Sequence, residues 1–188
     1  MKYCPKCSTE LVMRPNGGRE RPSCPSCDFV YFGEFSIGVG GVVIQNGKAL
    51  LIRRGIEPRR GWWQIPGGYC EHDESIHEAV VREVFEEAGI EARVESVLGL
   101  RHSLGAPSAN VYVIFRLIPI RGEPRVDGEE ITGADFFSLD ELEQMEKVQS
   151  LSKWAIHTAL ARQDGFLRID EPADLARPGY TLFGLPRE

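Results

Sequence analysis

The stretch that decides the fold covers residues 67–90 and reads GGYCEHDESIHEAVVREVFEEAGI. Its second half predicts a helix over residues 74–88, because apolar side chains recur there at helical spacing. The side chains expected to pack inward are Ile76, Ala79, Val80 and Val84. Gly89 follows directly and is typical of the residue that ends a helix, since glycine adopts the left-handed conformation without steric cost.

The opposite side of this predicted helix is acidic. Glu86 and Glu87 follow Glu83 by three and four residues, so the three carboxylates project from one side of the helix. Clustered carboxylates repel one another, and a hard divalent cation such as Mg²⁺ or Mn²⁺ relieves that repulsion. Arg82 could hold one carboxylate in place, and the Gly67-Gly68 pair lets backbone carbonyls approach a metal closely.

Glutamates clustered on a helix are, taken alone, typical of a solvated face, so the full spacing matters. It runs from Gly68 through Glu74 and Arg82-Glu83 to Glu86-Glu87 and Gly89. This pattern resembles the Nudix box at every defined position. Residues 63–68 before it and residues 136–142 after it also resemble the family, and the likeness covers roughly residues 36–160.

The resemblance implies both a fold and a reaction. Nudix enzymes hydrolyse a nucleoside diphosphate linked to another group, and divalent ions bridge the diphosphate oxygens. By the family pattern, Mg²⁺ or Mn²⁺ would be bound by Glu83, Glu86 and Glu87, with the Gly68 carbonyl assisting. Arg82 would orient the glutamates.

The general base differs between members of the family, and two candidates stay open. Glu86 lies in the box itself, and Glu130 lies in the loop before a predicted strand at 133–138. Related enzymes that act on ADP-ribose often use a loop glutamate near this position, which favours Glu130. The alternative is that Glu130 is simply a solvated loop carboxylate.

Candidate substrate contacts precede the box. Four arginines lie there, Arg53, Arg54, Arg59 and Arg60. One or two of them, with Arg53 and Arg54 as the candidates, are expected to contact phosphates, because the guanidinium fork matches phosphate oxygens. The others are expected to be solvated. Trp63 could stack on a nucleobase or pack in the core.

The N-terminal segment, residues 1–34, has few large aliphatic side chains and cannot form a core of its own. It contains Cys4-x-x-Cys7 and Cys24-x-x-Cys27, with turn-forming residues inside each pair. Four thiolates in two such knuckles predict a tetrahedral Zn²⁺ site, which would be structural because its coordination shell is closed. Zinc binding would then stabilise the segment. We interpret it as a zinc ribbon.

The remaining pattern alternates strands and helices. Apolar runs around Asn46-Gly47 predict a β-hairpin, and residues 53–73 are expected to form a loop. Further strands are expected at 92–101, 110–119 and 133–138, a second helix near 139 and a third at 148–162. The fold class is therefore α/β (α+β), a Nudix α/β/α sandwich with a mixed sheet. The expected domains are a ribbon at 1–34, a hydrolase domain at 35–163 and an extension at 164–188.

Substrate choice rests on resemblance within the family. NADH pyrophosphatases with a zinc ribbon carry a proline-rich run shortly after the box, and residues 100–107 lack it. The chain looks closer to plant-type ADP-ribose and FAD pyrophosphatases, so we expect such a dinucleotide to be cleaved with release of AMP. NADH pyrophosphatase and RNA-decapping activities are alternatives that use the same chemistry. A nucleic-acid-binding or regulatory protein built on the ribbon is an alternative of another class.

Composition limits the partners. The net charge is −6, from 28 acidic and 22 basic side chains, which argues against a broad nucleic-acid surface. No apolar run could span a bilayer and the N-terminus has no apolar signal segment, so a cytoplasmic location without a membrane partner is expected. A small nucleotide is the expected partner, and a homodimer formed through the ribbon remains an alternative.

Overall fold

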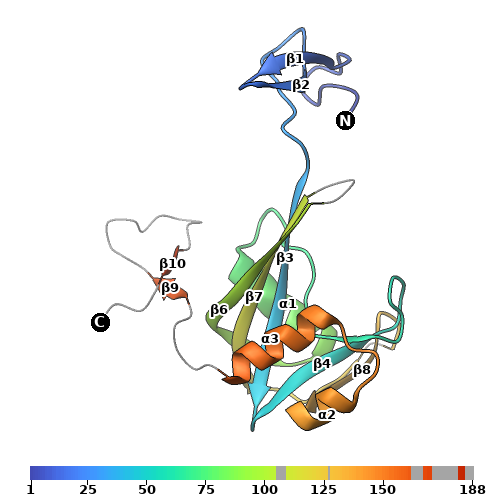
Figure 1. The fold of residues 1–188 in the computed structure, drawn as a ribbon, viewed down its shortest axis with the longest axis vertical. Coiled ribbons are helices and arrows are strands. Elements are labelled where there is room, and N and C mark those ends of the chain that lie inside the picture. Colours follow the sequence, from blue (N-terminus) through green and yellow to red (C-terminus); the bar gives the residue numbers. More distant parts are fainter. Residues whose placement is uncertain (105–108, 127, 162–166, 171–181, 185–188) are drawn as a thin grey trace.

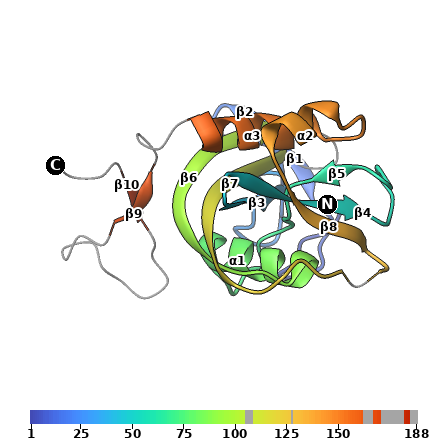
Figure 2. The same cartoon turned by 90° about the horizontal axis from the view of Figure 1, so that it is seen from below.

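The computed structural model describes residues 1–104, 109–126, 128–161, 167–170 and 182–184. Its main body is a mixed β-sheet between two helical layers. Figure 2 shows α1 (Ile76–Ala88) on one face of the sheet and α2 (Leu139–Gln144) with α3 (Ser150–Ala161) on the other. The predicted α/β/α sandwich is confirmed.

The sheet has six strands. Their order is β5 (Trp63–Gln64), β4 (Lys48–Arg54), β3 (Phe35–Gln45), β7 (Ala109–Arg121) and β6 (Glu91–Ser103), with β8 (Ile131–Phe137) also paired to β4. β3 and β7 run parallel, and the other pairs are antiparallel. The mixed sheet places the centre of β3 and β7 between the two helical layers, where their side chains are buried.

The predicted hairpin around Asn46-Gly47 is present, but its two strands pair only at the turn. Both turn residues have positive φ, 50° and 74°, as a tight two-residue hairpin turn requires. Pairing is limited to Ile44 with Ala49 and Gln45 with Lys48. Beyond that point β3 pairs with β7 while β4 pairs with β8 and β5.

Helix α1 begins at Ile76, two residues later than the predicted start at 74. Ser75 is the N-cap, and a capping box with Glu78 satisfies the first free backbone amides. Gly89 ends the helix in the left-handed conformation, as predicted. The buried side chains are Ala79, Val80, Val84 and Ala88, while Ile76 is only partly buried because it lies in the first turn.

Close packing of α1 on the sheet depends on Gly41 of β3. A Cβ atom at this position would lie 2.8 Å from Val84 Cγ2 and 2.9 Å from Leu117 Cδ1. The helix therefore sits close to β3, and its acidic side faces the residues that follow β5. This contact fixes the distance between the glutamates and the Gly67-Gly68 segment.

The stretch expected to be a loop, residues 53–73, contains the short strand β5. Trp63 and Gln64 pair with Arg53 and Ile52 of β4, and the Trp63 amide donates to the Lys147 carbonyl at 2.7 Å. Two residues are too few to give a periodic signal, which is why sequence patterning missed this strand. The predicted strands at 92–101 and 110–119 are both present but longer, and the predicted end of the third helix at 162 lies outside the described residues.

Two small hairpins flank the main body. β1 (Val12–Asn16) and β2 (Arg19–Ser23) pair antiparallel in the N-terminal segment, which Figure 1 shows beyond one end of the main sheet. β9 (Arg168–Asp170) and β10 (Leu182–Gly184) pair antiparallel near the C-terminus, and the Phe183 ring lies 5.8 Å from the Phe115 ring. Among the described residues, no helix is long and apolar enough to cross a membrane.

Candidate active site

The Arg82 guanidinium is the centre of a cluster of carboxylates. Its Nε and Nη2 donate to the two oxygens of Glu74 at 3.0 and 2.6 Å. Its Nη1 donates to Glu83 Oε1 at 2.9 Å and to Glu86 Oε2 at 3.0 Å. A fourth acceptor is the Tyr69 carbonyl at 3.2 Å. One planar group therefore fixes three carboxylates and the loop before the helix, and it holds the pKa of Glu74 below its ordinary value.

Glu87 lies apart from Arg82 and has a different partner. The Gly67 amide donates to its Oε2 at 2.7 Å. Burial raises the pKa of Glu87 to about 8, with additional repulsion from Glu83 and Glu130. The carboxylate is thus held in a poorly solvated position where a positive charge would be stabilising.

Glu83 and Glu86 differ in exposure although both accept from Arg82. The Glu83 side chain is 14% exposed and the Glu86 side chain 57% exposed. Burial raises the pKa of Glu83 even though Arg82 acts in the opposite direction. Glu83 faces the loop, and a Cβ atom on Gly68 would lie 2.5 Å from its Oε1. Only glycine leaves room for this carboxylate at the Gly68 backbone.

The Gly68 carbonyl accepts a hydrogen bond of 2.9 Å from the Val39 amide of β3. A carbonyl oxygen has two lone pairs, so this bond leaves one acceptor position. Gly68 is therefore anchored to the sheet, with the Glu83 carboxylate close to its Cα.

A cavity of about 650 Å³ opens beside Gly67 and Gly68. Its walls come from Gly38 of β3, the end of β4 and the loop after it, the residues around β5, the end of β6 with the start of β7, and the start of α3. Polar and charged lining residues include Arg54, Arg59, Gln64, Arg101, Asn110, Tyr112 and Gln149. The volume is within the range typical of small-molecule sites.

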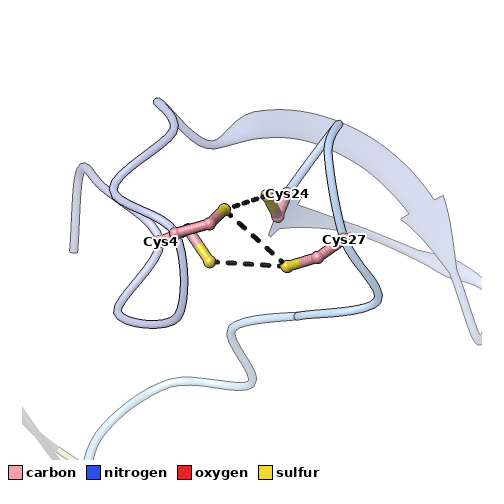
Figure 3. A group of neighbouring side chains, drawn as sticks. Cys4, Cys24 and Cys27 are labelled. Carbon is pink, nitrogen blue, oxygen red and sulfur yellow. Dashed lines mark hydrogen bonds between the residues drawn. The ribbon is translucent and has the colours of Figure 1, made fainter.

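The cysteines of the N-terminal segment form a second cluster. The Sγ–Sγ distances are 3.6 Å for Cys4–Cys27, 3.4 Å for Cys7–Cys24 and 3.9 Å for Cys7–Cys27. Figure 3 shows the labelled sulfurs turned toward one another. A tetrahedral site with zinc–sulfur bonds of about 2.3 Å has sulfur–sulfur edges of roughly 3.8 Å, so the four thiols could hold a metal ion.

Within the part of the chain that the structure describes, these thiols are the one group of three or more ligand atoms that all lie within 4.8 Å of one another. The glutamate carboxylates do not meet this limit: Glu83 and Glu86 are directed to Arg82, and Glu87 to Gly67.

The family model for the NUDIX domain matches residues 34–158. The chain belongs to the Nudix family.

Two curated relatives and one solved structure illustrate how similar the chain is to individual Nudix proteins. The ADP-ribose pyrophosphatase of Methanocaldococcus jannaschii is 34% identical over 111 residues, which cover 58% of this chain and 66% of that protein. The NAD-capped RNA hydrolase NudC of Stutzerimonas stutzeri is 28% identical over 165 residues, which cover 87% of this chain and 58% of that protein. The crystal structure of a NUDIX hydrolase from Nitrosomonas europaea matches with a TM-score of 0.71 and 26% identity, and the match covers 84% of this chain and 90% of that one. The chain spans less than two thirds of the length of either curated relative.

Of the three residues predicted to contact the substrate, Arg54 lines the cavity, whereas Arg53 and Trp63 are outside its described lining. Arg53 is exposed on β4 and is outside the described cavity lining. The Trp63 ring packs edge-on against Phe137 at 5.1 Å, in the core under α2 and α3. Of the two interpretations open for Trp63, core packing is the one that its position favours.

Glu130 lies near the Nudix carboxylates although it is far from them in sequence. Its backbone carbonyl accepts from the Gly55 amide at 2.7 Å, and a Cβ atom on Gly55 would collide with the Glu129 carbonyl. Its charge contributes to the raised pKa of Glu87. The loop is thus fixed against the end of β4, with an exposed carboxylate within electrostatic reach of the site.

Sequence patterning missed Arg101, Tyr112 and Gln149, which line the Nudix cavity from other elements. Tyr112 is paired with Gly38 on one side and with Arg101 on the other, in β3 and β6. Its ring occupies the space that Cβ atoms on Gly38, Gly40 and Gly67 would need. Glycines inside a predicted strand were the available signal, because they mark the close approach of another group.

Proposed function

We propose that the chain hydrolyses the diphosphate bond of a nucleoside diphosphate linked to another group, with ADP-ribose, FAD or a related dinucleotide as substrate and AMP as product. The observation that carries this proposal is the position of the Arg82 carboxylate cluster beside Gly67-Gly68, at the edge of a nucleotide-sized cavity. Membership of the Nudix family and similarity to a protein named ADP-ribose pyrophosphatase support it.

The proposed ligands of Mg²⁺ or Mn²⁺ are Glu83, Glu86 and Glu87, with the free lone pair of the Gly68 carbonyl. These groups fit a hard divalent cation, because all are oxygen donors and Glu83 and Glu87 are carboxylates with raised pKa values in poorly solvated positions. When bound, the ions would offset charge on the diphosphate and lower the pKa of the attacking water.

Two side chains would position these ligands. Arg82 fixes the orientation of Glu83 and Glu86 through one nitrogen atom. Glu74 accepts two bonds from Arg82 and one of 2.9 Å from the Glu71 amide, so it ties the loop to the helix. Removal of a proton from the attacking water is assigned to Glu130, with Glu86 as the alternative.

The substrate could also be NADH or a capped RNA. The relative named NAD-capped RNA hydrolase matches a larger share of this chain than the relative named ADP-ribose pyrophosphatase does. Residues 100–107 nevertheless lack the proline-rich run of NADH pyrophosphatases, and the net charge of −6 disfavours a long nucleic acid. The dinucleotide assignment is therefore preferred.

The cysteine cluster is proposed to bind one structural Zn²⁺ through Cys4, Cys7, Cys24 and Cys27. Sulfur–sulfur distances of 3.4 to 3.9 Å support tetrahedral coordination. Four protein ligands leave no open coordination position, so this metal would stabilise the N-terminal segment without taking part in hydrolysis.

The test is a substrate screen with the full chain and Mg²⁺. ADP-ribose, FAD, NADH, diadenosine polyphosphates and NAD-capped RNA are supplied separately, and AMP or release of the cap is measured. We expect turnover of ADP-ribose or FAD that is lost in a folded Glu83→Gln variant. Absence of turnover on every dinucleotide would overturn the proposal, and turnover of capped RNA alone would replace it with the RNA alternative.

A further inference from the structure

The cavity beside Gly67 and Gly68 is positively charged. Three arginines, Arg54, Arg59 and Arg101, are part of its wall, and none of the described lining residues is an aspartate or glutamate. This is unusual for a chain with six more acidic than basic side chains. A cavity of about 650 Å³ is small enough for charges on its walls to act on one ligand, since the screening length at physiological salt is about 8 Å.

Each of these arginines is held by a neutral acceptor. Arg54 Nε donates to the Pro58 carbonyl at 2.9 Å, and Arg59 Nη1 donates to Gln149 Oε1 at 3.1 Å. Arg101 Nη2 donates to Asn110 Oδ1. Among the described residues, no carboxylate lies within ion-pair distance of any of the three.

Three arginines outside the cavity do have carboxylate partners. Arg116 pairs with Glu95 at 2.7 Å, and Arg121 pairs with Glu91 at 2.7 Å. Arg82 contacts three carboxylates. An amide or carbonyl acceptor orients a guanidinium without cancelling its charge, whereas a carboxylate does both. Arg59 and Arg101 are therefore oriented by neutral groups, whereas the charge of Arg54 also acts on Glu87.

Arg101 is the most firmly oriented of the three. Its acceptor Asn110 is itself fixed, because the Asn110 amide donates to Ser36 Oγ at 2.9 Å and to the Ser36 carbonyl at 3.2 Å. The guanidinium lies 5.1 Å from the centre of the Tyr112 ring, its cross-strand partner. Stacking and one hydrogen bond leave the other guanidinium donors available to a ligand.

The cavity has more positive charge than a diphosphate bound at the glutamates requires. Divalent ions offset the charge of the diphosphate at Glu83, Glu86 and Glu87 in the proposed reaction. Arg54 is the cavity arginine near these carboxylates, because its charge acts on Glu87. Arg101 reaches the cavity from β6, over the Tyr112 ring, and has no carboxylate partner among the described residues. Its charge is therefore available to an anionic group of the ligand other than the metal-bound diphosphate.

We infer that this cavity binds a second phosphate on the nucleoside of the substrate, with Arg101 as its main contact. The chemical class is a nucleoside diphosphate derivative that is also phosphorylated on the ribose 2′ or 3′ oxygen. The inference rests on the proposed hydrolysis and specifies its substrate class. A guanidinium can donate two parallel hydrogen bonds to such a phosphate.

The binding test uses ligands that have no diphosphate bond, so turnover cannot interfere. Affinities of AMP and of adenosine 2′,5′- and 3′,5′-bisphosphate for the full chain are measured by calorimetry without added Mg²⁺. We expect one bisphosphate to bind about tenfold or more tightly than AMP. Arg101→Gln should bring the ratio of bisphosphate affinity to AMP affinity close to one, and Arg101→Lys should keep part of the difference. Arg93→Gln, an exposed arginine on the same strand outside the described lining, should leave the ratio unchanged.

Equal affinity for AMP and both bisphosphates would overturn the inference. An equal loss for all three ligands in Arg101→Gln would also overturn it, because Arg101 would then bind the phosphate common to them. Hydrolysis of NADPH and NADH with Mg²⁺ separates this result from the proposed function. If NADPH and NADH are hydrolysed at the same rate and no bisphosphate binds better than AMP, the proposed hydrolysis stands and the second phosphate site is excluded. If a bisphosphate binds better than AMP and this preference depends on Arg101, but no dinucleotide is hydrolysed, the phosphate site stands and the proposed hydrolysis is excluded.

Discussion

The Gly67 amide donates a hydrogen bond of 2.7 Å to Glu87 Oε2, which joins the loop before α1 to the last turn of that helix. The two residues are twenty positions apart in sequence. The Tyr112 hydroxyl lies close to Gly67, where an added Cβ atom would be 2.7 Å from it. The position of one proposed metal ligand thus depends on a backbone amide that the sheet holds in place.

Replacing Gly67 with alanine should disrupt this arrangement. Gly67 has a φ of 153°, and an added methyl group would also collide with the Val39 carbonyl. We expect Gly67→Ala to lower the free energy of unfolding by about 2 kcal/mol or more and to raise the Mg²⁺ concentration needed for half-maximal activity. Urea unfolding and Mg²⁺ titration measure both effects.

Gly47→Ala is the matched control for Gly67. Its φ is also positive, at 74°, but no atom lies within 4 Å of the added Cβ. Gly47→Ala should lower the free energy of unfolding by about 1 kcal/mol and leave the Mg²⁺ dependence of activity unchanged. A normal Mg²⁺ dependence in Gly67→Ala would show that the amide does not position Glu87.

Arg82→Lys should impair catalysis while keeping the positive charge. A lysine ammonium cannot reproduce the planar contacts that Arg82 makes with Glu74, Glu83 and Glu86. Misplaced carboxylates should lower kcat/KM by roughly 100-fold. Steady-state kinetics on the substrate found by the screen provide the measurement, and Arg121→Lys, an exposed arginine paired with Glu91, is the control. Activity within a few-fold of wild type would mean that the carboxylates keep their places without the guanidinium.

Glu130→Gln tests the general base. If Glu130 removes the proton from water, kcat should fall by roughly 10²- to 10⁴-fold, while substrate KM changes little. Glu86→Gln tests the alternative, with a larger expected effect on the Mg²⁺ dependence because Glu86 is a proposed metal ligand. Glu123→Gln, at another exposed acidic position, is the control. Near-normal rates in Glu130→Gln would exclude Glu130 from the mechanism.

Cys24→Ser should release zinc without removing the hydrolytic site. Cys24 is buried, and its sulfur lies 3.4 Å from that of Cys7. We expect the purified full chain to contain about one zinc ion and Cys24→Ser to contain almost none, by elemental analysis. Hydrolysis with Mg²⁺ should persist, because the matched Nudix domain begins at residue 34. Cys70→Ser, in the loop before α1, should keep its zinc. Retention of full zinc by Cys24→Ser would contradict the ligand assignment.

Several site features could be predicted from the sequence because they depend on local spacing. Positions three and four residues apart share a helix face, so Glu83, Glu86 and Glu87 were assigned to one side of a helix. Gly89 was recognised as its end for an equally local reason, the left-handed conformation at the C-cap. The paired cysteines converge within two short turns, whose geometry is fixed over four residues.

Other features could not be predicted because they depend on contacts between distant segments. β5 is too short to show periodicity, and its two residues are held by β4 and by the Lys147 carbonyl. The orientation of Arg101 depends on Asn110, Ser36 and Tyr112, which come from two other strands. No sequence spacing relates these positions.

The sequence by itself determined the acidic helix, its arginine and the two cysteine pairs, since covalent geometry and helical periodicity place neighbouring residues relative to one another. Only the tertiary structure decided which partner each group has. It placed the Gly67 amide against Glu87, packed Trp63 against Phe137 in the core and brought three arginines to the wall of one cavity. Those outcomes depend on strand register and on the packing of α1 against Gly41, which arise only when the whole sheet assembles.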